Sequence, residues 1–323
     1  GDYDGNGSAD IAVWRPSNGT WYRRAQDTTA SSSQFGLPGD LLPSRESYYR
    51  GARNANGKTR LLRNGVDSSL SLYRASGSIL YSLTLSALTP RSFNAPSGSH
   101  ILRGDYDGDG TPDSALFNAG SWIIAFGNGA LQSLTWGIPG DSPVSGDFDG
   151  DGRSDVAVFR PNSGNGFATW FILQSSNGLA QQVSWGLPGD EAIAADYNGD
   201  GITDLAVWRP GTGTWFVRDG RSGAFIQAVQ WGLFGDFVRT ADFDDDGRSD
   251  KIAWRPGTGT WYILFSSGGA SATAWGLPGD IPAPATFLSE KVDFSVWRPS
   301  NATLYVLSQQ NAQISRASGL FAG

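Results

Sequence analysis

An acidic nine-residue motif that occurs five times constrains this chain more than any other feature. Each copy has oxygen-bearing side chains at positions 1, 3, 5 and 9 and glycine at position 6. Of the 20 side chains at those four positions, 18 are Asp and two are Asn. Carboxylates this close together repel one another strongly unless a cation lies between them, so the motif predicts a metal site. The copies are DYDGNGSAD (2–10), DYDGDGTPD (105–113), DFDGDGRSD (147–155), DYNGDGITD (196–204) and DFDDDGRSD (242–250).

Calcium is the ion that these ligands suit best, because it accepts six to eight oxygen atoms at flexible distances, whereas Mg²⁺ demands a stricter octahedron. Glycine at position 6 permits the positive φ of a sharp turn. The carbonyl group at position 7 would add a ligand to the four side chains. We therefore predict about five structural Ca²⁺ ions. The predicted ligands are Asp2, Asp4, Asn6, Ser8, Asp10, Asp105, Asp107, Asp109, Thr111, Asp113, Asp147, Asp149, Asp151, Arg153, Asp155, Asp196, Asn198, Asp200, Ile202, Asp204, Asp242, Asp244, Asp246, Arg248 and Asp250.

The second half of the motif differs from an EF-hand loop. Its last carboxylate is at position 9, where an EF-hand has Glu at position 12. Short stretches of β-branched and aromatic residues follow each copy, namely IAVW, SALF, VAVF, LAVW and KIAW. Such stretches predict β-strands. The alternative interpretation, acidic turns without metal, accounts poorly for five copies with fixed spacing.

The acidic loops are landmarks of a longer repeat, in which a WRP element, a GTW turn and a WGLPGD hexamer follow in order. Units begin near residues 2, 52, 105, 147, 196, 242 and 285. The copies at 52–60 and 285–293 lack most of the acidic positions, so we expect them to be metal-free. Each unit has room for about four strands. This pattern predicts an all-β fold, a single seven-bladed β-propeller domain over residues 1–323 with four-stranded antiparallel blades. A β-solenoid is the alternative.

The recurrent tryptophans and arginines are predicted to be structural. All 13 Trp lie in the WRP, GTW and WG elements. Recurrence in every unit is what packing between blades requires, although a sugar-binding platform is the alternative for so many aromatic residues. The arginine of WRP is expected to be paired or stacked. Its copies are Arg15, Arg160, Arg209, Arg255 and Arg298.

Composition excludes several classes of protein. The chain has no Cys, which rules out disulfides and thiolate chemistry, and a single histidine, His100, disfavours Ser-His-Asp catalysis. We therefore predict that it is not an enzyme. A net charge of −7 argues against nucleic-acid binding, and no apolar run is long enough for membrane insertion. Because Gly1 leads directly into the first loop, we expect an excised or processed chain whose first blade lacks its opening strand.

These loops between short strands resemble the FG-GAP/VCBS repeats of calcium-binding β-propellers, as in integrin α-subunit heads, a fungal propeller lectin and many bacterial secreted proteins. The VWRPSNGTWY and WGLPGD elements are similar to the bacterial branch. The resemblance covers all seven units and is specific in five. It implies calcium at the blade loops and an extracellular, secreted or cell-surface location. The family includes adhesins, lectins and accessory domains of polysaccharide-degrading enzymes, so the resemblance does not fix the function.

The second unit suggests where a partner could bind. Between residues 45 and 91, eight basic residues stand against two acidic ones. With Tyr48 and Tyr49, Arg50 and Arg53 would form a basic face for an anionic glycan or a protein. In the alternative interpretation, Lys58 and Arg60 only replace the lost cation.

Together, these features predict a non-catalytic, calcium-stabilised module for binding or adhesion to a protein or glycan partner. The alternatives are a self-assembling surface or filament subunit, which would associate through edge strands, and a lectin-like or accessory domain of a polysaccharide-degrading enzyme.

Overall fold

The computed structural model describes residues 99–282 except 111, 112 and 165, together with residues 284, 292–298 and 303–309. It also describes the backbone of strands at 11–15, 20–24, 30–34, 69–74, 79–84, 90–94 and 314–318. Within these ranges, no helix is long and apolar enough to cross a bilayer.

Five antiparallel sheets have four strands each, and in every one the strands are hydrogen-bonded in chain order. The first two sheets are β7 (His100–Gly104), β8 (Asp113–Asn118), β9 (Ser121–Ala125) and β10 (Leu131–Thr135), and β11 (Ser142–Gly146), β12 (Asp155–Arg160), β13 (Thr169–Leu173) and β14 (Ala180–Ser184). The next two are β15 (Glu191–Ala192), β16 (Leu205–Arg209), β17 (Thr214–Arg218) and β18 (Phe225–Gln230), and β19 (Phe237–Ala241), β20 (Asp250–Arg255), β21 (Thr260–Leu264) and β22 (Ala270–Ala274). The fifth is β23 (Ile281–Pro282), β24 (Phe294–Arg298), β25 (Thr303–Leu307) and β26 (Ile314–Ser318).

Two further sheets contain three described strands each. One is formed by β1 (Ile11–Arg15), β2 (Thr20–Arg24) and β3 (Ala30–Gln34), and the other by β4 (Ser69–Arg74), β5 (Ile79–Thr84) and β6 (Pro90–Asn94). The first pairs Trp14 with Trp21. This is the WRP-to-GTW pairing that Trp208 and Trp215 make in the β15–β18 sheet.

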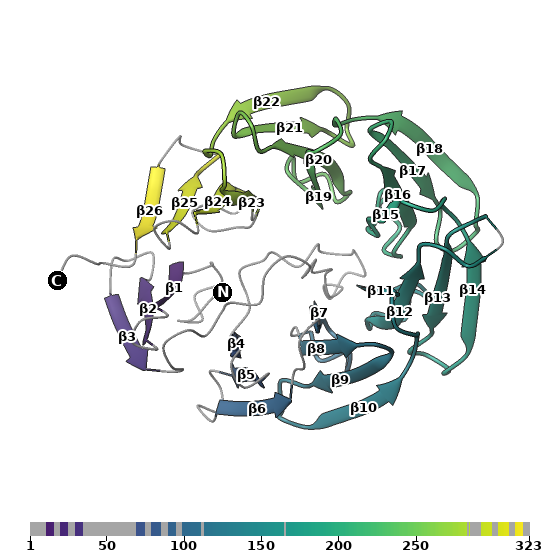
Figure 1. Cartoon of the computed structure of the whole chain (residues 1–323), viewed down its shortest axis with the longest axis horizontal. Helices are drawn as coiled ribbons and strands as arrows, with labels where there is room; N and C mark the ends of the chain where they lie inside the picture. Colours follow the sequence, from purple (N-terminus) through teal and green to yellow (C-terminus); the bar gives the residue numbers. More distant parts are fainter. Residues whose placement is uncertain are drawn as a thin grey trace.

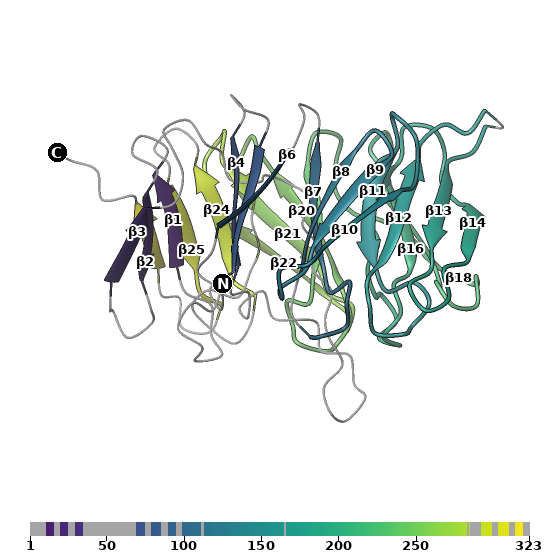
Figure 2. The same cartoon turned by 90° about the horizontal axis from the view of Figure 1, so that it is seen from below.

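The sheets stand side by side around a common centre, as the blades of a propeller do (Figure 1). The first strand of each four-stranded blade lies nearest the centre and the fourth lies at the rim, and the side view shows the blades as upright sheets (Figure 2). The predicted all-β propeller with four-stranded antiparallel blades is therefore confirmed for these five blades.

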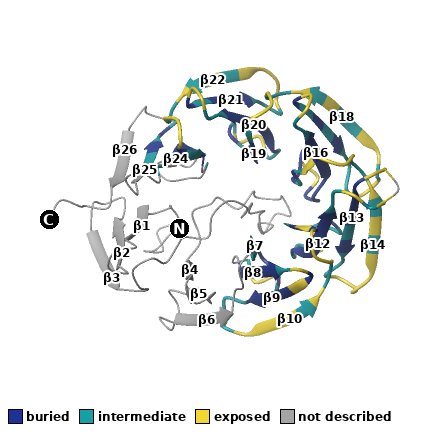
Figure 3. Cartoon of the chain, in the orientation of Figure 1, coloured by how far each residue is buried: buried dark blue, intermediate teal, exposed yellow. Residues whose placement is uncertain are grey.

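Burial falls from the second strand of a blade to the fourth (Figure 3). All residues of β12 are buried except Arg160, whereas β14 has no buried residue. Both faces of the second strand are covered by neighbouring blades, which explains its continuous apolar sequence, VAVF. The rim strand has one edge and much of its surface in water, and its sequence, AQQVS, is mostly polar.

The hydrophobic core consists of clusters between consecutive blades. In one cluster Phe159 and Trp170 of the β11–β14 blade pack with Leu205 and Val207 of the next blade. Each of six tryptophans from the WRP and GTW elements is at most 1% exposed, which confirms the prediction of structural packing. They are Trp122, Trp170, Trp208, Trp215, Trp254 and Trp261.

The tryptophan of the WG element joins one blade to the next by a hydrogen bond. Nε1 of Trp136 donates to the carbonyl oxygen of Phe171 at 3.0 Å, and Nε1 of Trp231 donates to that of Tyr262 at 3.1 Å. Trp185 and Trp275 make the same bond to Phe216 and Tyr305. Each acceptor lies on the third strand of the following blade, so the WG element is a connector between blades.

The arginine of WRP makes two hydrogen bonds to the aspartate that ends the WGLPGD hexamer. In the β11–β14 blade, Nε and Nη2 of Arg160 lie 2.7 and 2.8 Å from the two carboxylate oxygens of Asp141. The guanidinium carbon lies 4.3 Å from the centre of the Phe171 ring. The prediction of a paired and stacked arginine is confirmed here and in three further blades, where the pairs are Arg209–Asp190, Arg255–Asp236 and Arg298–Asp280.

Candidate metal sites in the blade loops

Each described acidic loop connects the first strand of a blade to the second. Because the strands alternate in direction, this loop lies at the same end of the blade as the hairpin between the third and fourth strands. The loop 147–155 thus meets Ser175 and Ser176, which follow β13. All four described loops therefore lie on one face of the propeller.

The first and last aspartates of a loop hold its turn together. The carboxylate of Asp147 accepts hydrogen bonds from the backbone N–H groups of Gly150 and Gly152 at 2.6 and 2.9 Å. Gly152, at position 6, has a φ of 91°, as its predicted role requires. Asp155 accepts from the N–H groups of Phe148 and Ser175 at 2.7 and 2.6 Å. The equivalent pairs Asp105 and Asp113, Asp196 and Asp204, and Asp242 and Asp250 make the same kinds of bond.

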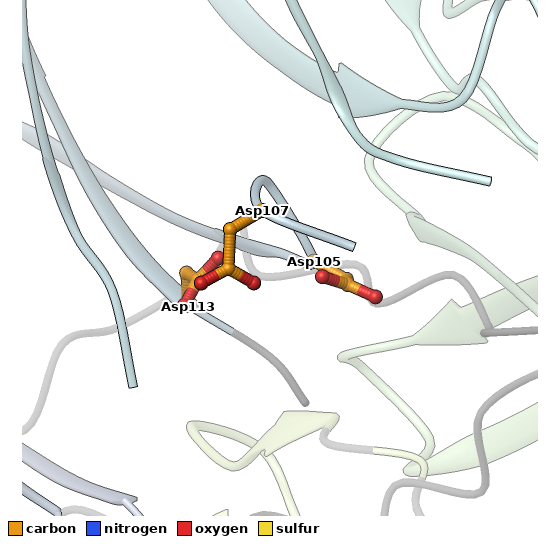
Figure 4. Close-up of side chains that lie close together, drawn as sticks. All are labelled: Asp105, Asp107 and Asp113. Carbon is orange, nitrogen blue, oxygen red and sulfur yellow. The ribbon is translucent and has the colours of Figure 1, made fainter. Parts of the chain in front are cut away.

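Three loops bring three carboxylates together. In each group one oxygen of every residue lies within 4.8 Å of the others. Two oxygens bound to one Ca²⁺ at 2.3–2.6 Å can be at most about 5 Å apart, so this spacing fits a shared calcium ion. Figure 4 shows one group, with Asp107 and Asp113 facing each other beside Asp105. The groups are Asp105, Asp107 and Asp113; Asp147, Asp149 and Asp155; and Asp242, Asp244 and Asp246.

Without a cation, these carboxylates resist ionisation. Burial, and after it the charges of other carboxylates in the same loop, raises the pKa of Asp113, Asp155 and Asp250 to about 7. Burial also raises the pKa of Asp242 to about 6. A divalent cation would favour the ionised form of every one of these groups. The donor set therefore fits Ca²⁺ in both spacing and charge.

In two of the loops, serines from the facing hairpin make hydrogen bonds to the aspartates. These serines were not predicted from the sequence. Ser176 Oγ donates to Asp149 at 2.6 Å, and Ser175 Oγ lies 3.0 Å from both oxygens of Asp151. Ser266 and Ser267 make the corresponding bonds to Asp246 and Asp244. The only signal in the sequence is a serine pair at the same place in two units, QSSN and FSSG.

The aspartate at position 5 is shared with the arginine at position 7 in two loops. Nε and Nη2 of Arg153 donate to Oδ2 of Asp151, and Arg248 makes the same two bonds to Asp246. Asp151 lies outside the carboxylate group of its loop, as does Asp109, whereas Asp246 belongs to its group. The structure therefore brings positions 1 and 3 together in all three loops and varies the third member.

The loop 196–204 has a different arrangement. Nδ2 of Asn198 donates to Asp219 at 2.7 Å and approaches Asp204 at 3.5 Å. No group of three carboxylates forms in this loop among the described residues. Lys251 is 3% exposed, and its Nζ lies 4.7 Å from the centre of the Tyr197 ring. Its charge interacts with Asp204 and Asp250, so a protein cation lies beside this site.

Neighbouring loops are also joined to each other. The N–H group of Ser154 donates to the carbonyl oxygen of Asp105 at 2.6 Å, and Thr203 bonds Asp147 in the same way at 2.7 Å. The chains approach so closely here that a Cβ atom on Gly146 would lie 2.6 Å from Oγ1 of Thr203. An ion in one loop would therefore stiffen the neighbouring loop as well.

Several predicted site residues lie outside the described residues. They are the first loop (Asp2, Asp4, Asn6, Ser8 and Asp10), Thr111, and the proposed partner-binding group Tyr48, Tyr49, Arg50 and Arg53. Of the remaining position-7 residues, Arg153 and Arg248 lie beside the aspartates that they pair with, and Ile202 is buried.

The fold and these loops define the class, a β-propeller with clusters of aspartate in its blade loops. The FG-GAP repeat family model matches residues 139–171, which contain the loop 147–155 and the strands on either side of it. The chain is thus a β-propeller that carries an FG-GAP repeat. No curated protein sequence matches it.

Solved structures confirm the fold and nothing finer. The chain is similar to virginiamycin B lyase from Staphylococcus aureus, with a TM-score of 0.54, 11% identity and 88% of each chain covered. It is also similar to BBS1N in its complex with ARL6DN, with a TM-score of 0.54, 11% identity and coverage of 98% of this chain and 90% of that one. AztD from Citrobacter koseri gives a TM-score of 0.51, 13% identity and coverage of 96% and 94%.

Proposed function

We propose that this protein is a non-catalytic, seven-bladed, calcium-stabilised β-propeller that acts outside the cell as a binding or adhesion module for a protein or glycan partner. The observation that carries the proposal is that each of three loops brings three carboxylates within 4.8 Å of one another. Loops of this kind need millimolar calcium, which extracellular fluids supply and the cytosol does not. The seven units of the sequence and the two additional three-stranded sheets support the blade number.

Calcium in these sites would act on structure. Asp147 and Asp155 already bind the backbone of the loop and of the β13–β14 hairpin, so an ion between them fixes both. A site with a dissociation constant of about 0.1 mM contributes about 1.4 kcal/mol at 1 mM Ca²⁺. Several such sites together stabilise the propeller by an amount comparable with the stability of a typical domain.

The metal part of the proposal is tested by stripping the protein with EDTA and titrating calcium. We expect the unfolding midpoint to rise and the bound-metal count to be at least three, reaching five if the loops 2–10 and 196–204 also bind. Asp155→Asn should remove one ion, whereas Glu191→Gln, outside every loop, should remove none. No bound calcium in the wild type would overturn this part of the proposal.

The binding part is tested separately, with the calcium-loaded protein on arrays of glycans and of extracellular matrix proteins. We expect saturable binding to at least one class of ligand. A calcium-loaded, folded protein that binds nothing on either array would contradict a role as a binding module.

A structural role is the second candidate, and the rim strands favour it. The strands β10, β14, β18 and β22 contain no charged residue, although each is the exposed edge of its blade. Charged residues are the usual protection of such edges against pairing with another chain. Sedimentation velocity at increasing concentration tests this candidate, because pairing of edges would give species that grow beyond the 34.3 kDa monomer.

A further inference from the structure

The β15–β18 blade departs from the repeat at one pair of facing residues. Arg218 of β17 lies opposite Phe225 of β18. The same pair is Leu173 and Ala180 in the preceding blade, and Leu264 and Ala270 in the following one. The strand register shifts between Val217 and Arg218, so the backbone is irregular at the same place. This blade thus differs from its two neighbours in both facing residues, and its backbone is irregular at the same place.

This pair lies against the WG tryptophan of the preceding blade. The guanidinium carbon of Arg218 lies 5.9 Å from the centre of the Trp185 ring, and the rings of Trp185 and Phe225 are 6.4 Å apart. At the preceding junction, Leu173 belongs to the same apolar cluster as Trp136. A leucine that covers the tryptophan is thus exchanged for an arginine, and an exposed phenylalanine is added beside it. We call Arg218, Phe225 and Trp185 the junction site.

In the part of the chain that the structure describes, no acid pairs with the arginine of the junction site. Its Nε is buried without a hydrogen-bond partner, whereas Arg160, Arg209, Arg255 and Arg298 each bind an aspartate through two nitrogens. The adjacent carboxylate of Asp219 accepts hydrogen bonds from Ser222 and Asn198 instead. The positive charge of Arg218 is thus available to an acidic ligand.

The guanidinium of Arg218 lies close to the turn that follows its strand. Gly223 in this turn has a φ of 71°, which favours glycine, and a Cβ atom there would lie 2.6 Å from Nη2 of Arg218.

We propose that the junction site binds a carboxylated sugar of an acidic glycan. A guanidinium group binds a carboxylate through two parallel hydrogen bonds, and Arg218 has none of its nitrogens committed to another acid. Phe225 is 61% exposed and offers a ring face to the C–H groups of a sugar. The rim strands β14 and β18 that border this junction contain no charged side chain that would repel or neutralise an acidic ligand.

This inference rests on the proposed function as a binding module and names its ligand class. With three to five Ca²⁺ bound, the formal net charge of −7 becomes −1 to +3, so the overall charge of the protein does not attract an acidic polymer strongly. Attraction must therefore be local, and it depends on one arginine. That dependence makes the inference testable with a single pair of substitutions.

The test is calorimetric titration of the calcium-loaded protein with trigalacturonate. The key variant, R218L/F225A, restores the Leu–Ala pair of the neighbouring blades, so it is expected to fold and to keep the calcium-induced rise in midpoint. We expect it to lose about tenfold or more in affinity, because a charge-assisted pair is removed. Arg221→Leu, an exposed arginine in the same hairpin, is the matched control and should bind like the wild type.

Comparison of ligands completes the test. The methyl ester of trigalacturonate, which has no charge, should not bind measurably. Equal binding by the wild type and R218L/F225A would overturn the junction site and leave a glycan-binding function in place. Equal binding of triglutamate would replace the glycan by an acidic peptide. A wild type that binds no trigalacturonate but binds ligands on the arrays would overturn the inference alone, and one that binds neither would overturn both proposals.

Discussion

At the scale of single residues, the aspartates of this chain fall into two groups that differ in the cation beside them. The four described aspartates that end a WGLPGD-type hexamer, Asp141, Asp190, Asp236 and Asp280, are buried, and each binds a protein arginine. Asp105 and Asp113 are buried beside other acids, and burial first and the neighbouring negative charges second raise their pKa values. The charges of the first group are neutralised by arginines of the folded chain, whereas the second group would be neutralised by an ion bound from solution.

Asp190 tests the first group. Asp190→Asn would leave the Arg209 guanidinium without its charged partner, in a position only 28% exposed. We expect a loss of about 2–4 kcal/mol in the free energy of unfolding, measured by urea denaturation in saturating calcium. Glu191→Gln changes the same charge on an exposed neighbour and should cost little. Similar losses in both variants would show that the pair carries no special stability.

Lys251 is the residue whose burial is hardest to reconcile with its charge. It occupies the position of Val156, Leu205 and Phe294 in three other blades and of Ser114 in a fourth, and burial lowers its pKa to about 8. In saturating calcium the bound ions would neutralise Asp204 and Asp250 in place of the lysine, so Lys251→Leu should raise the stability by about 1–3 kcal/mol. A loss of stability would indicate instead that the lysine neutralises Asp204 and Asp250, and the bound-metal count of the variant would show whether an ion takes its place.

At the scale of elements, the unit that matters is an acidic loop together with the hairpin facing it. Asp155 accepts a hydrogen bond from the N–H group of Ser175, and the hydroxyl group of Ser176 donates one to Asp149. The loop and the hairpin therefore stabilise each other's conformation. The loop also borders the loop of the next blade through the backbone of Thr203.

The ion-free loops predict a particular response to pH. The pKa values of Asp113, Asp155 and Asp250 are about 7 in the folded chain and about 3.9 in an unfolded one. Between these values the folded chain binds more protons, so its stability must fall as pH rises from about 4 to 7. In EDTA the melting temperature should thus be higher at about pH 5.5 than at about pH 8.

Calcium should reverse that order, because it binds the ionised carboxylates. The calcium-induced rise in melting temperature is then larger at the higher pH. Scanning calorimetry at both pH values, with and without calcium, makes the comparison. The same trend in EDTA and in calcium would mean that these loops do not bind the ion.

Much of the fold could be predicted from the sequence, because repetition exposes what each position needs. Gly152 and Trp170 recur at fixed places, and their roles as a turn residue and a core residue follow from that recurrence. The partner of Arg160 could not be predicted, because Asp141 precedes it by 19 residues and meets it only through strand pairing. The serines of the hairpins, the amide of Asn198 and the junction site depend in the same way on which strands lie side by side.

At the scale of the whole molecule, none of the blades whose side chains are described has a core of its own. Each apolar cluster takes side chains from two consecutive blades, and each described WG tryptophan donates to the blade that follows. Stability is therefore shared along the ring, as in other proteins made of stacked repeats.

Trp231 tests this sharing. Trp231→Phe keeps an aromatic ring but removes the bond to the carbonyl of Tyr262, so we expect a loss of about 1–2 kcal/mol. Hydrogen exchange should increase in β17 and in β21 together. An increase confined to the β15–β18 blade would show that the blades open independently.

The direction of the bonds between blades has a consequence for how such a chain can grow. At the four described joints, a unit presents a tryptophan donor to the third-strand carbonyl of its successor, so the three units with a joint on either side carry one half of each. Duplication or loss of one whole unit would leave every remaining joint with its proper counterpart. Only the curvature of the ring would have to adjust. In evolution, the number of blades of such a chain could therefore change by whole units without a new kind of contact between blades.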